Sequence, residues 1–247
     1  MNGLLSVLFA PAIHSADRGT SLLLELCGRS PGVFVEVGAH APVEGSQTWA
    51  LEQAGWTGLL VEPLREYAAL LRAERRAIVE EVACGPPELD GSRAPFKVAD
   101  YASTLADAFI NPRVTASEVR MVPIASLDTL LARHAMSKVD FLSLDVEGTE
   151  VSVLRGFSIE RFRPGLIVIE DWVGDLTRHS YLTSHGYKVI RRCGHDGWYV
   201  PKEVPFALSQ WGRFQLFAKY RLLTPFRAGR YALRRARYRR RYRASAV

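Results

Sequence analysis

The stretch FVEVGAHAPVEG, residues 34–45, runs from an apolar segment through an acid to a glycine turn, as the start of a nucleotide-binding loop does. The apolar segment predicts a buried strand, and Gly38 allows the sharp turn that follows it. A dinucleotide loop needs two further glycines so that the backbone can approach a pyrophosphate, and here none follows until Gly45. Glu36 would also repel a diphosphate. The stretch therefore predicts an α/β fold whose nucleotide-like ligand carries no pyrophosphate.

Outward from this loop, apolar runs of strand length alternate with segments of helical period, which is the pattern of a βαβ sheet. Strands are expected at 33–37, 58–62, 78–83, 139–145 and 166–170, and three of these runs end in an acid. Crossover helices are expected within 63–77 and 126–135, the second with Ser126 as its N-cap. The carboxyl ends of such parallel strands form the edge where open sheets bind ligands.

The last part of the expected sheet has a different pattern. After a helix at 176–184, the run GYKVIRRCGHDGWYV (186–200) holds two alternating segments joined by His195, Asp196 and Gly197. Asp-Gly between such segments predicts a β-hairpin. An antiparallel hairpin that closes a parallel sheet gives a mixed architecture, which a plain dinucleotide-binding fold lacks.

Composition divides the chain into a body and a tail. With 247 residues and 48% hydrophobic content, it has the size of one α/β domain plus an appendage. Residues 1–211 hold 20 Lys and Arg against 26 Asp and Glu, a net charge of −6, whereas 212–247 hold 12 basic residues and no acid, giving +12. We expect a domain at 1–205, with its core at about 31–201, and a basic aromatic tail at 206–247.

The cysteines and the N-terminal segment bear on the expected location. The three cysteines are widely spaced and lack a C-x-x-C motif, which predicts neither a disulfide framework nor a zinc site. The apolar run 4–10 is too short to span a bilayer, and no basic residue precedes it. This run predicts a packing helix, with a signal peptide as the alternative. We expect a cytoplasmic protein.

The acids at the strand ends suggest which ligand the edge binds. Glu62 ends the second expected strand, where an acid can accept both ribose hydroxyls of an adenosine. Val82 and Ala83, at the end of the third, would flank an adenine. S-adenosylmethionine combines this adenosine with a carboxylate for the loop amides and a cation for Glu36. The alternative is that Glu36 only pairs with an arginine or caps a helix.

The string LSLDVEGTEVSVLRGF (142–157) makes the pattern specific. Together with FVEVGAHAPVEGSQTWALEQAGWTGLLVEP (34–63), VACG (82–85) and IVIED (167–171), it resembles the FkbM family of S-adenosylmethionine-dependent methyltransferases over roughly residues 31–172. The resemblance implies a Rossmann-like class I methyltransferase fold: a mostly parallel seven-stranded sheet with a C-terminal antiparallel hairpin. It also implies O-methylation of a hydroxyl on a sugar, glycolipid or secondary metabolite.

The resemblance also assigns residues to the cofactor site. Glu36, Gly38 and His40 fall on the family's first cofactor motif, and Glu36 and His40 stand where many relatives carry Asp and Asn. Glu62 falls on the ribose-binding acid, and Asp145 and Glu147 fall on the motif after the fourth strand. The predicted cofactor-binding residues are Glu36, Val37, Gly38, Ala39, His40, Ser46, Thr48, Glu62, Pro63, Val82, Ala83 and Asp145.

Methyl transfer to oxygen needs an in-line hydroxyl and a place for its proton. Asp145, Glu147 and His40 are the candidate catalytic residues. The alternative to a protein base is Mg²⁺ bound by Asp145, Glu170 and Asp171, which would lower the pKa of the acceptor's hydroxyl. A third interpretation is that Glu170 and Asp171 only cap the helix that follows them.

The tail predicts a partner. Trp211, Phe214, Phe217 and Leu222 recur at helical spacing among Lys and Arg, and RRARYRRRYR (234–243) follows. A basic amphipathic helix of this kind favours peripheral contact with the inner face of the membrane. Nucleic-acid binding is less favoured because the apolar part precedes the arginine-rich part. A solvated tail without a partner is the remaining alternative.

Two other functions compete with a methyltransferase that acts on a small-molecule or glycolipid acceptor. An NAD-dependent oxidoreductase could use the same sheet plan, but the glycines and a Tyr-x-x-x-Lys motif are missing from the sequence. A non-catalytic, membrane-associated binding protein could retain the fold. Acids at several strand ends argue against it, because a scaffold has no need of them.

Overall fold

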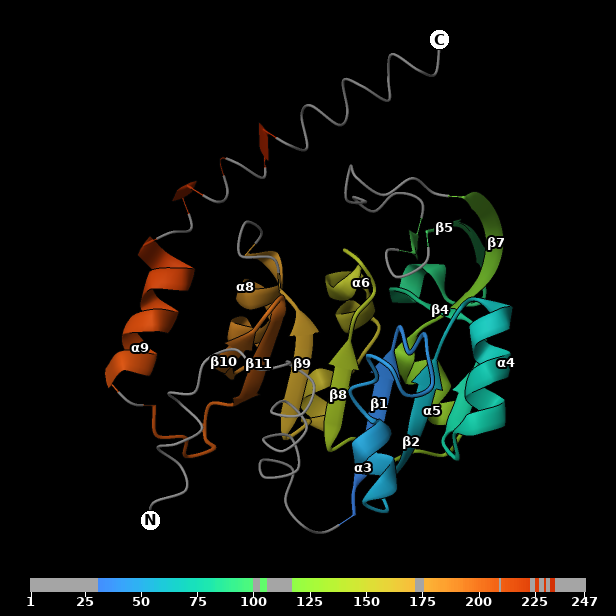
Figure 1. Ribbon diagram of the computed structural model, residues 1–247, viewed down its shortest axis with the longest axis horizontal. Helices are drawn as coiled ribbons and strands as arrows, with labels where there is room; N and C mark the ends of the chain where they lie inside the picture. The colour runs from blue at the N-terminus through green and yellow to red at the C-terminus, as the bar shows by residue number, and fades with distance from the viewer. Residues whose placement is uncertain are drawn as a thin grey trace.

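The computed structural model describes residues 31–99, 103–105, 117–171, 176–208 and 210–222, with short pieces between 225 and 233. It shows an α/β domain in which helices cover both faces of a twisted sheet (Figure 1). The helix or signal peptide expected at 4–10 lies outside the described residues. Among those that are described, no helix is both long and apolar enough to cross a membrane.

The main sheet has seven strands in the order β10-β11-β9-β8-β1-β2-β3. They are β1 (Val33–Val37), β2 (Thr57–Val61), β3 (Ile78–Glu80), β8 (Phe141–Leu144), β9 (Leu166–Glu170), β10 (Tyr187–Cys193) and β11 (Asp196–Pro201). Strand β11 is antiparallel to both of its neighbours, and the other neighbouring pairs are parallel. This is the order of the class I methyltransferase fold, so the predicted fold class is confirmed.

The central strands form where the chain is continuously apolar. The runs VFVEV, GLLV, FLSL and LIVIE are buried almost throughout, as parallel strands covered on both faces must be. On one face the sheet packs against α5 (Leu127–Arg133), α6 (Glu150–Arg155), α7 (Ile159–Phe162) and α8 (Thr177–Ser184). On the other it packs against α3 (Trp49–Gln53) and α4 (Arg65–Glu74).

The strand expected at 78–83 is wrong, because the chain changes sheets within it. Strand β3 ends at Glu80, and β4 (Ala83–Cys84) then pairs with β7 (Glu118–Ala125) of a second sheet. The second sheet has the order β4-β7-β5-β6, and β5 (Arg93–Val98) and β6 (Thr104–Leu105) complete it after a 3₁₀ turn η1 (Pro87–Leu89). Strands β5, β6 and β7 are only partly buried, so their apolar signal is weak.

The hairpin forms as predicted, but its turn lies earlier. Cys193 pairs directly with Asp196, so Gly194 and His195 make the two-residue turn. Gly194 has a positive φ of 56°, which suits the first position of such a turn. Gly197 instead lies within β11, where a Cβ atom would approach the ring of Tyr199 to 2.7 Å.

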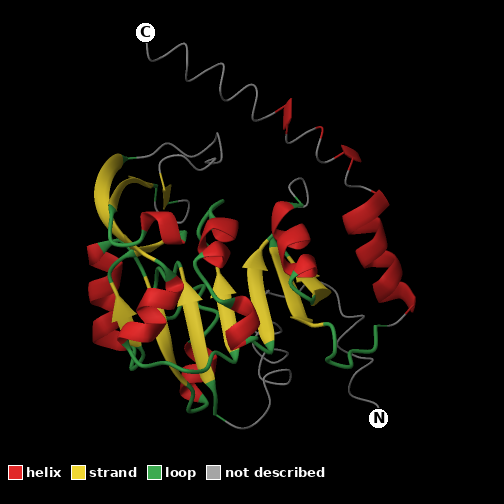
Figure 2. Cartoon of the chain, turned by 180° about the vertical axis from the view of Figure 1, so that it is seen from behind, coloured by secondary structure: helices red, strands yellow, loops and turns green. Residues whose placement is uncertain are grey.

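The N-terminal part of the tail is helical. Helix α9 (Gln210–Phe217) continues as a π-helical turn, η2 (Ala218–Leu222). Seen from either side, α9 lies at the β10 end of the sheet, away from the second sheet (Figures 1 and 2).

Candidate active site

Gly38 brings the ends of β1 and β8 together in the middle of the sheet. Its φ is 83°, and a Cβ atom there would lie 1.8 Å from the carbonyl oxygen of Asp145. Its N–H donates to the carbonyl oxygen of Val61 at 2.9 Å, which joins β2 to the same turn. Glycine is therefore required here by the close approach of the Asp145 backbone as well as by the turn.

An open pocket with about 550 Å³ of empty volume lies over these strand ends. Part of this volume is open to solvent. The predicted residues that line it are Val37, Gly38, His40, Glu62, Pro63, Val82, Ala83, Asp145 and Glu147. Phe96, Ser103 and Leu105 of the second sheet also line it. None of these three was among the site residues predicted from the sequence.

Glu62 is held with its carboxylate at the pocket wall. Its Oε1 accepts the N–H of Leu64 at 2.9 Å, and its Oε2 accepts the N–H of His40 at 3.0 Å. Burial raises the pKa of Glu62 to about 7, although these two hydrogen bonds act to lower it. Each carboxylate oxygen keeps a further lone pair, so the group suits a pair of neighbouring hydroxyls such as those of a ribose.

His40 lines the pocket in a left-handed conformation, with a φ of 45°. Its ring lies over that of Tyr67, with 3.8 Å between the centroids, and both ring nitrogens are enclosed by protein. This packing suits a residue that orients Glu62 and the loop better than one that exchanges protons with a substrate. A catalytic role for His40 stays a prediction.

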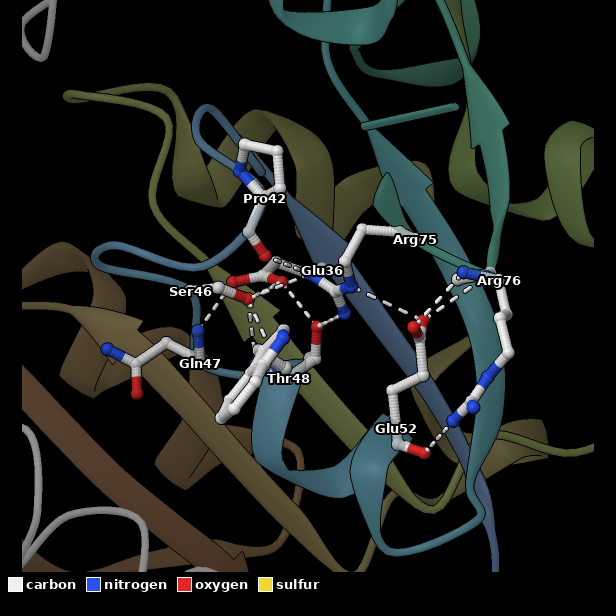
Figure 3. A network of polar contacts seen from close by, with 10 residues as sticks. Glu36, Pro42, Ser46, Gln47, Thr48, Glu52, Arg75 and Arg76 are labelled. Atoms are coloured by element: carbon white, nitrogen blue, oxygen red, sulfur yellow. Dashed lines mark hydrogen bonds and ion pairs between the residues drawn. The ribbon is translucent and has the colours of Figure 1, made fainter. Parts of the chain in front are cut away.

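Glu36 does not line the pocket, and its side chain lies in a polar network on the loop after β1 (Figure 3). It accepts the Ser46 hydroxyl at 3.0 Å, the Gln47 N–H at 2.7 Å and the Thr48 hydroxyl. Burial raises the pKa of Glu36, against the lowering effect of these donors. Of the predicted cofactor residues, Glu36, Ser46 and Thr48 therefore shape the loop beside the pocket, and Ala39 packs in the core.

Arg75 closes this network and was not anticipated from the sequence. Its guanidinium donates to the carbonyl oxygen of Pro42 at 2.9 Å, to Ser46 at 3.1 Å and to Thr48 at 3.0 Å (Figure 3). Its Nε lies 3.3 Å from a carboxylate oxygen of Glu52, and both side chains are buried. Glu52 also accepts the N–H groups of residues 76 and 77. The alternative considered for Glu36 was pairing with an arginine. Arg75 reaches Glu36 through the hydroxyls of Ser46 and Thr48, and its charge acts to lower the pKa of Glu36.

Three carboxylates meet at the other side of the pocket. Oxygens of Asp145, Glu147 and Glu170 lie within 4.8 Å of one another. Asp145 lines the open pocket where solvent reaches it, but protein atoms surround it closely, and this burial raises its pKa to about 7, with a further contribution from Glu147. Burial also raises the pKa of Glu147 to about 7, and Glu150 adds to it.

Asp171 is not part of this carboxylate group, which corrects the predicted Mg²⁺ site. One of its carboxylate oxygens accepts the hydroxyls of Tyr199 and Tyr220, each at 2.8 Å. Asp171 is fully buried, and it is not among the carboxylates whose oxygens lie within 4.8 Å of one another. Glu147 takes its place beside Asp145 and Glu170.

The loop that carries Asp145 and Glu147 is fixed by a buried ion pair that the sequence did not reveal. Glu150 and Arg178, from α6 and α8, approach to 2.5 Å. Glu150 also accepts the N–H of Gly148 at 2.9 Å. Glu147 itself has a φ of 53°, a conformation that the surrounding contacts must maintain. The acids at the pocket are therefore held by packing behind them.

The strand order and the pocket at the carboxyl ends of β1, β2 and β8 define a class I methyltransferase architecture. Residues 36–194 match the methyltransferase FkbM domain, and the chain belongs to this family. Methyltransferases of this kind in general take the methyl group from S-adenosylmethionine.

Among solved structures, the chain matches that of a methyltransferase-like protein from Silicibacter pomeroyi. It has a TM-score of 0.42 and 12% sequence identity, and the match covers 85% of this chain and 97% of that protein. No curated protein sequence matches this chain.

Proposed function

We propose that the protein is an S-adenosylmethionine-dependent O-methyltransferase that methylates a hydroxyl of a sugar, glycolipid or secondary metabolite. The observation that carries the proposal is the pairing, in one pocket, of the Glu62 carboxylate with the Asp145 carboxylate, whose pKa is about 7. The first suits an adenosine, and the second suits the removal of a proton near neutral pH.

The donor site would be formed by residues on the β1, β2 and β4 side of the pocket. Glu62 would accept the two ribose hydroxyls, and Val82 and Ala83 would contact the adenine through apolar atoms. S-adenosylmethionine supplies a methyl group on a cationic sulfur. The acids Asp145 and Glu147 near that cation would offset its charge in place of the Glu36 contact expected from the sequence.

The acceptor would enter from the side of the second sheet, where Phe96, Ser103 and Leu105 line the pocket. Asp145 would accept the proton of the hydroxyl as the methyl group is transferred. A carboxylate whose pKa is close to neutral is a better base than an ordinary aspartate, because it binds the proton more tightly and is still ionised in part. Glu147 raises that pKa and so supports the base.

A variant of this chemistry uses Mg²⁺ at Asp145, Glu147 and Glu170, whose oxygens lie within 4.8 Å of one another. Such oxygen ligands suit Mg²⁺, which would neutralise the acids and lower the pKa of a bound hydroxyl. Activity that survives EDTA treatment without added metal would exclude the metal and leave Asp145 as the base.

Calorimetric titrations test the donor. We expect S-adenosylmethionine and S-adenosylhomocysteine to bind and NAD not to bind. Glu62→Gln should weaken both sulfur compounds by about tenfold or more, because a charged acceptor for two hydroxyls is lost. Glu66→Gln, the same change at an exposed acid of α4, is the control and should bind as the wild type does.

Failure of both sulfur compounds to bind would overturn the proposal. The acceptor is identified separately, by transfer of a labelled methyl group to members of each acceptor class. Methylation at nitrogen or carbon by the purified protein, with no labelled ether product, would contradict O-methylation while leaving the family assignment intact.

A further inference from the structure

One side of the tail is attached to the domain. Tyr220 is buried, and its hydroxyl donates to the Asp171 carboxylate at 2.8 Å. Its ring stacks on that of His179, with centroids 4.5 Å apart. Leu216, one helical turn earlier, is half buried. This side of α9 and η2 therefore packs against α8 and the end of β9.

Other positions of the same segment expose large apolar side chains. Phe217 is 56% exposed and Leu222 57%, and Phe226, just beyond η2, is 75% exposed. Phe214, one turn before Phe217, is also exposed. Single exposed apolar residues are ordinary, but several within a short helical segment usually mark an interaction surface. We call Phe214, Phe217, Leu222 and Phe226 the apolar ridge.

The charge around the apolar ridge identifies the chemistry of its partner. Residues 212–247 contain 12 Lys and Arg and no acid, while the preceding 211 residues carry a net charge of −6. Arg213 and Arg221 are exposed within the helical segment itself. A partner that takes up both aromatic side chains and this positive charge must offer an apolar interior behind an anionic surface, as an anionic lipid bilayer does.

We infer that the tail docks the protein on an anionic membrane surface, with the apolar ridge in the headgroup region and the arginines on lipid phosphates. The Tyr220 contact makes this more than a flexible tether, because it attaches the docked segment to the strand end next to Glu170. The inference goes beyond the proposed function and is independent of it, since lipid binding requires neither methyl donor nor acceptor.

Co-sedimentation of the full chain with lipid vesicles tests the inference. We expect binding to vesicles of phosphatidylcholine mixed with an equal amount of phosphatidylglycerol, weaker binding to phosphatidylcholine alone, and release as salt is raised. Phe217→Ser with Leu222→Ser should lower the partition coefficient by about tenfold or more, because two apolar side chains no longer enter the interface.

A matched control uses exposed apolar residues far from the tail. Val119 and Met121 of β7 are 59% and 53% exposed, so Val119→Ser with Met121→Ser makes the same chemical change elsewhere and should leave vesicle binding unchanged. Thermal unfolding of both variants checks that the domain is intact.

Three results would overturn the inference. The first is wild-type protein that does not sediment with anionic vesicles at low salt, and the second is a tail variant that sediments as the wild type does. The third is single-stranded DNA that removes the protein from vesicles and binds the wild type and the tail variant equally. That result would assign the positive charge to nucleic acid.

Discussion

At the scale of single residues, Gly38 has two separate reasons to be glycine, and a matched pair of substitutions separates them. Gly38 and Gly45 both have a positive φ, 83° and 78°, but only at Gly38 would a Cβ atom meet another atom, the Asp145 carbonyl oxygen. A Cβ atom at Gly45 would have no atom within 4 Å outside its chain neighbours.

We predict that Gly45→Ala lowers the free energy of unfolding by about 1 kcal/mol, the cost of a left-handed alanine. Gly38→Ala should lower it by about 3 kcal/mol or more, because β1 and β8 must also separate. Urea denaturation measures both values. Equal losses for the two variants would show that the contact with Asp145 has no energetic weight.

The raised pKa values of the pocket acids predict an unusual dependence of stability on pH. Glu62, Asp145 and Glu147 each have a pKa of about 7 in the folded protein, above their values in the unfolded chain. Between about pH 5 and pH 7 the folded state therefore binds more protons than the unfolded state does, and the free energy of unfolding must fall as pH rises.

We expect the protein without ligands to be more stable at about pH 5.5 than at about pH 7.5, and Asp145→Asn to make this difference smaller. Glu66→Gln is the control. The backbone and Arg120 lower the pKa of Glu66, so its titration changes the stability of the protein only at more acid pH than the range compared here. Thermal unfolding across this pH range provides the measurement. A difference that Asp145→Asn leaves unchanged would mean that Asp145 is not the group that titrates.

At the scale of elements, the loop after β1 depends on Arg75. Its guanidinium is buried between the donors around Glu36 and the Glu52 carboxylate. We predict that Arg75→Met destabilises the fold by about 3–5 kcal/mol, since it leaves acids buried without their cation. Adding Glu52→Gln should restore part of this loss, which a double-mutant cycle measures.

The control is Arg72→Met, because Arg72 pairs with Glu81 at the surface and should contribute less than about 1 kcal/mol. If Arg75→Met were equally mild, the network in Figure 3 would be incidental to the loop.

The same elements show what the sequence could predict. Strands β1, β2, β8 and β9 are mostly apolar and almost fully buried, so they were located within one or two residues, and acids were expected at their carboxyl ends. Strands β5 and β7 are largely exposed, each contains a proline (Pro95 and Pro123), and they pair across a long gap in sequence, so the local sequence identifies them only weakly. The expected strand 78–83 joins two short strands, β3 and β4, because the sequence does not show that they belong to different sheets.

Prediction of the site was limited by side-chain direction. Glu36 and Glu62 both lie at strand ends, yet Glu62 lines the pocket and Glu36 points into the Ser46–Thr48 network. The difference comes from the turn at Gly38 and from Arg75, far along the chain. Asp171 was also assigned to the pocket. Its tyrosine partners lie on β11 and in the tail, far along the chain, so the sequence near Asp171 gave no sign of them.

At the scale of the whole molecule, Tyr220 joins a tail of strongly positive charge to an acidic domain. Its hydroxyl and that of Tyr199 both donate to Asp171, and burial raises the pKa of Tyr220, so the hydroxyl keeps its proton. A neutral hydroxyl that donates to a buried carboxylate stabilises the attachment of the tail. Losing this hydroxyl costs free energy, because the buried acid then accepts one hydrogen bond fewer.

We predict that Tyr220→Phe loosens the tail without unfolding the domain. Trypsin should then cleave at Arg213 and Arg221 several times faster, because cleavage follows the population of detached tail. The melting temperature of the domain should change little. Tyr181→Phe, which removes a hydroxyl bonded to the Leu154 carbonyl on α6, is the control and should leave tail cleavage unchanged. Cleavage at the wild-type rate in Tyr220→Phe would show that stacking on His179 alone attaches the tail, and that membrane docking would not depend on the hydrogen bond to Asp171.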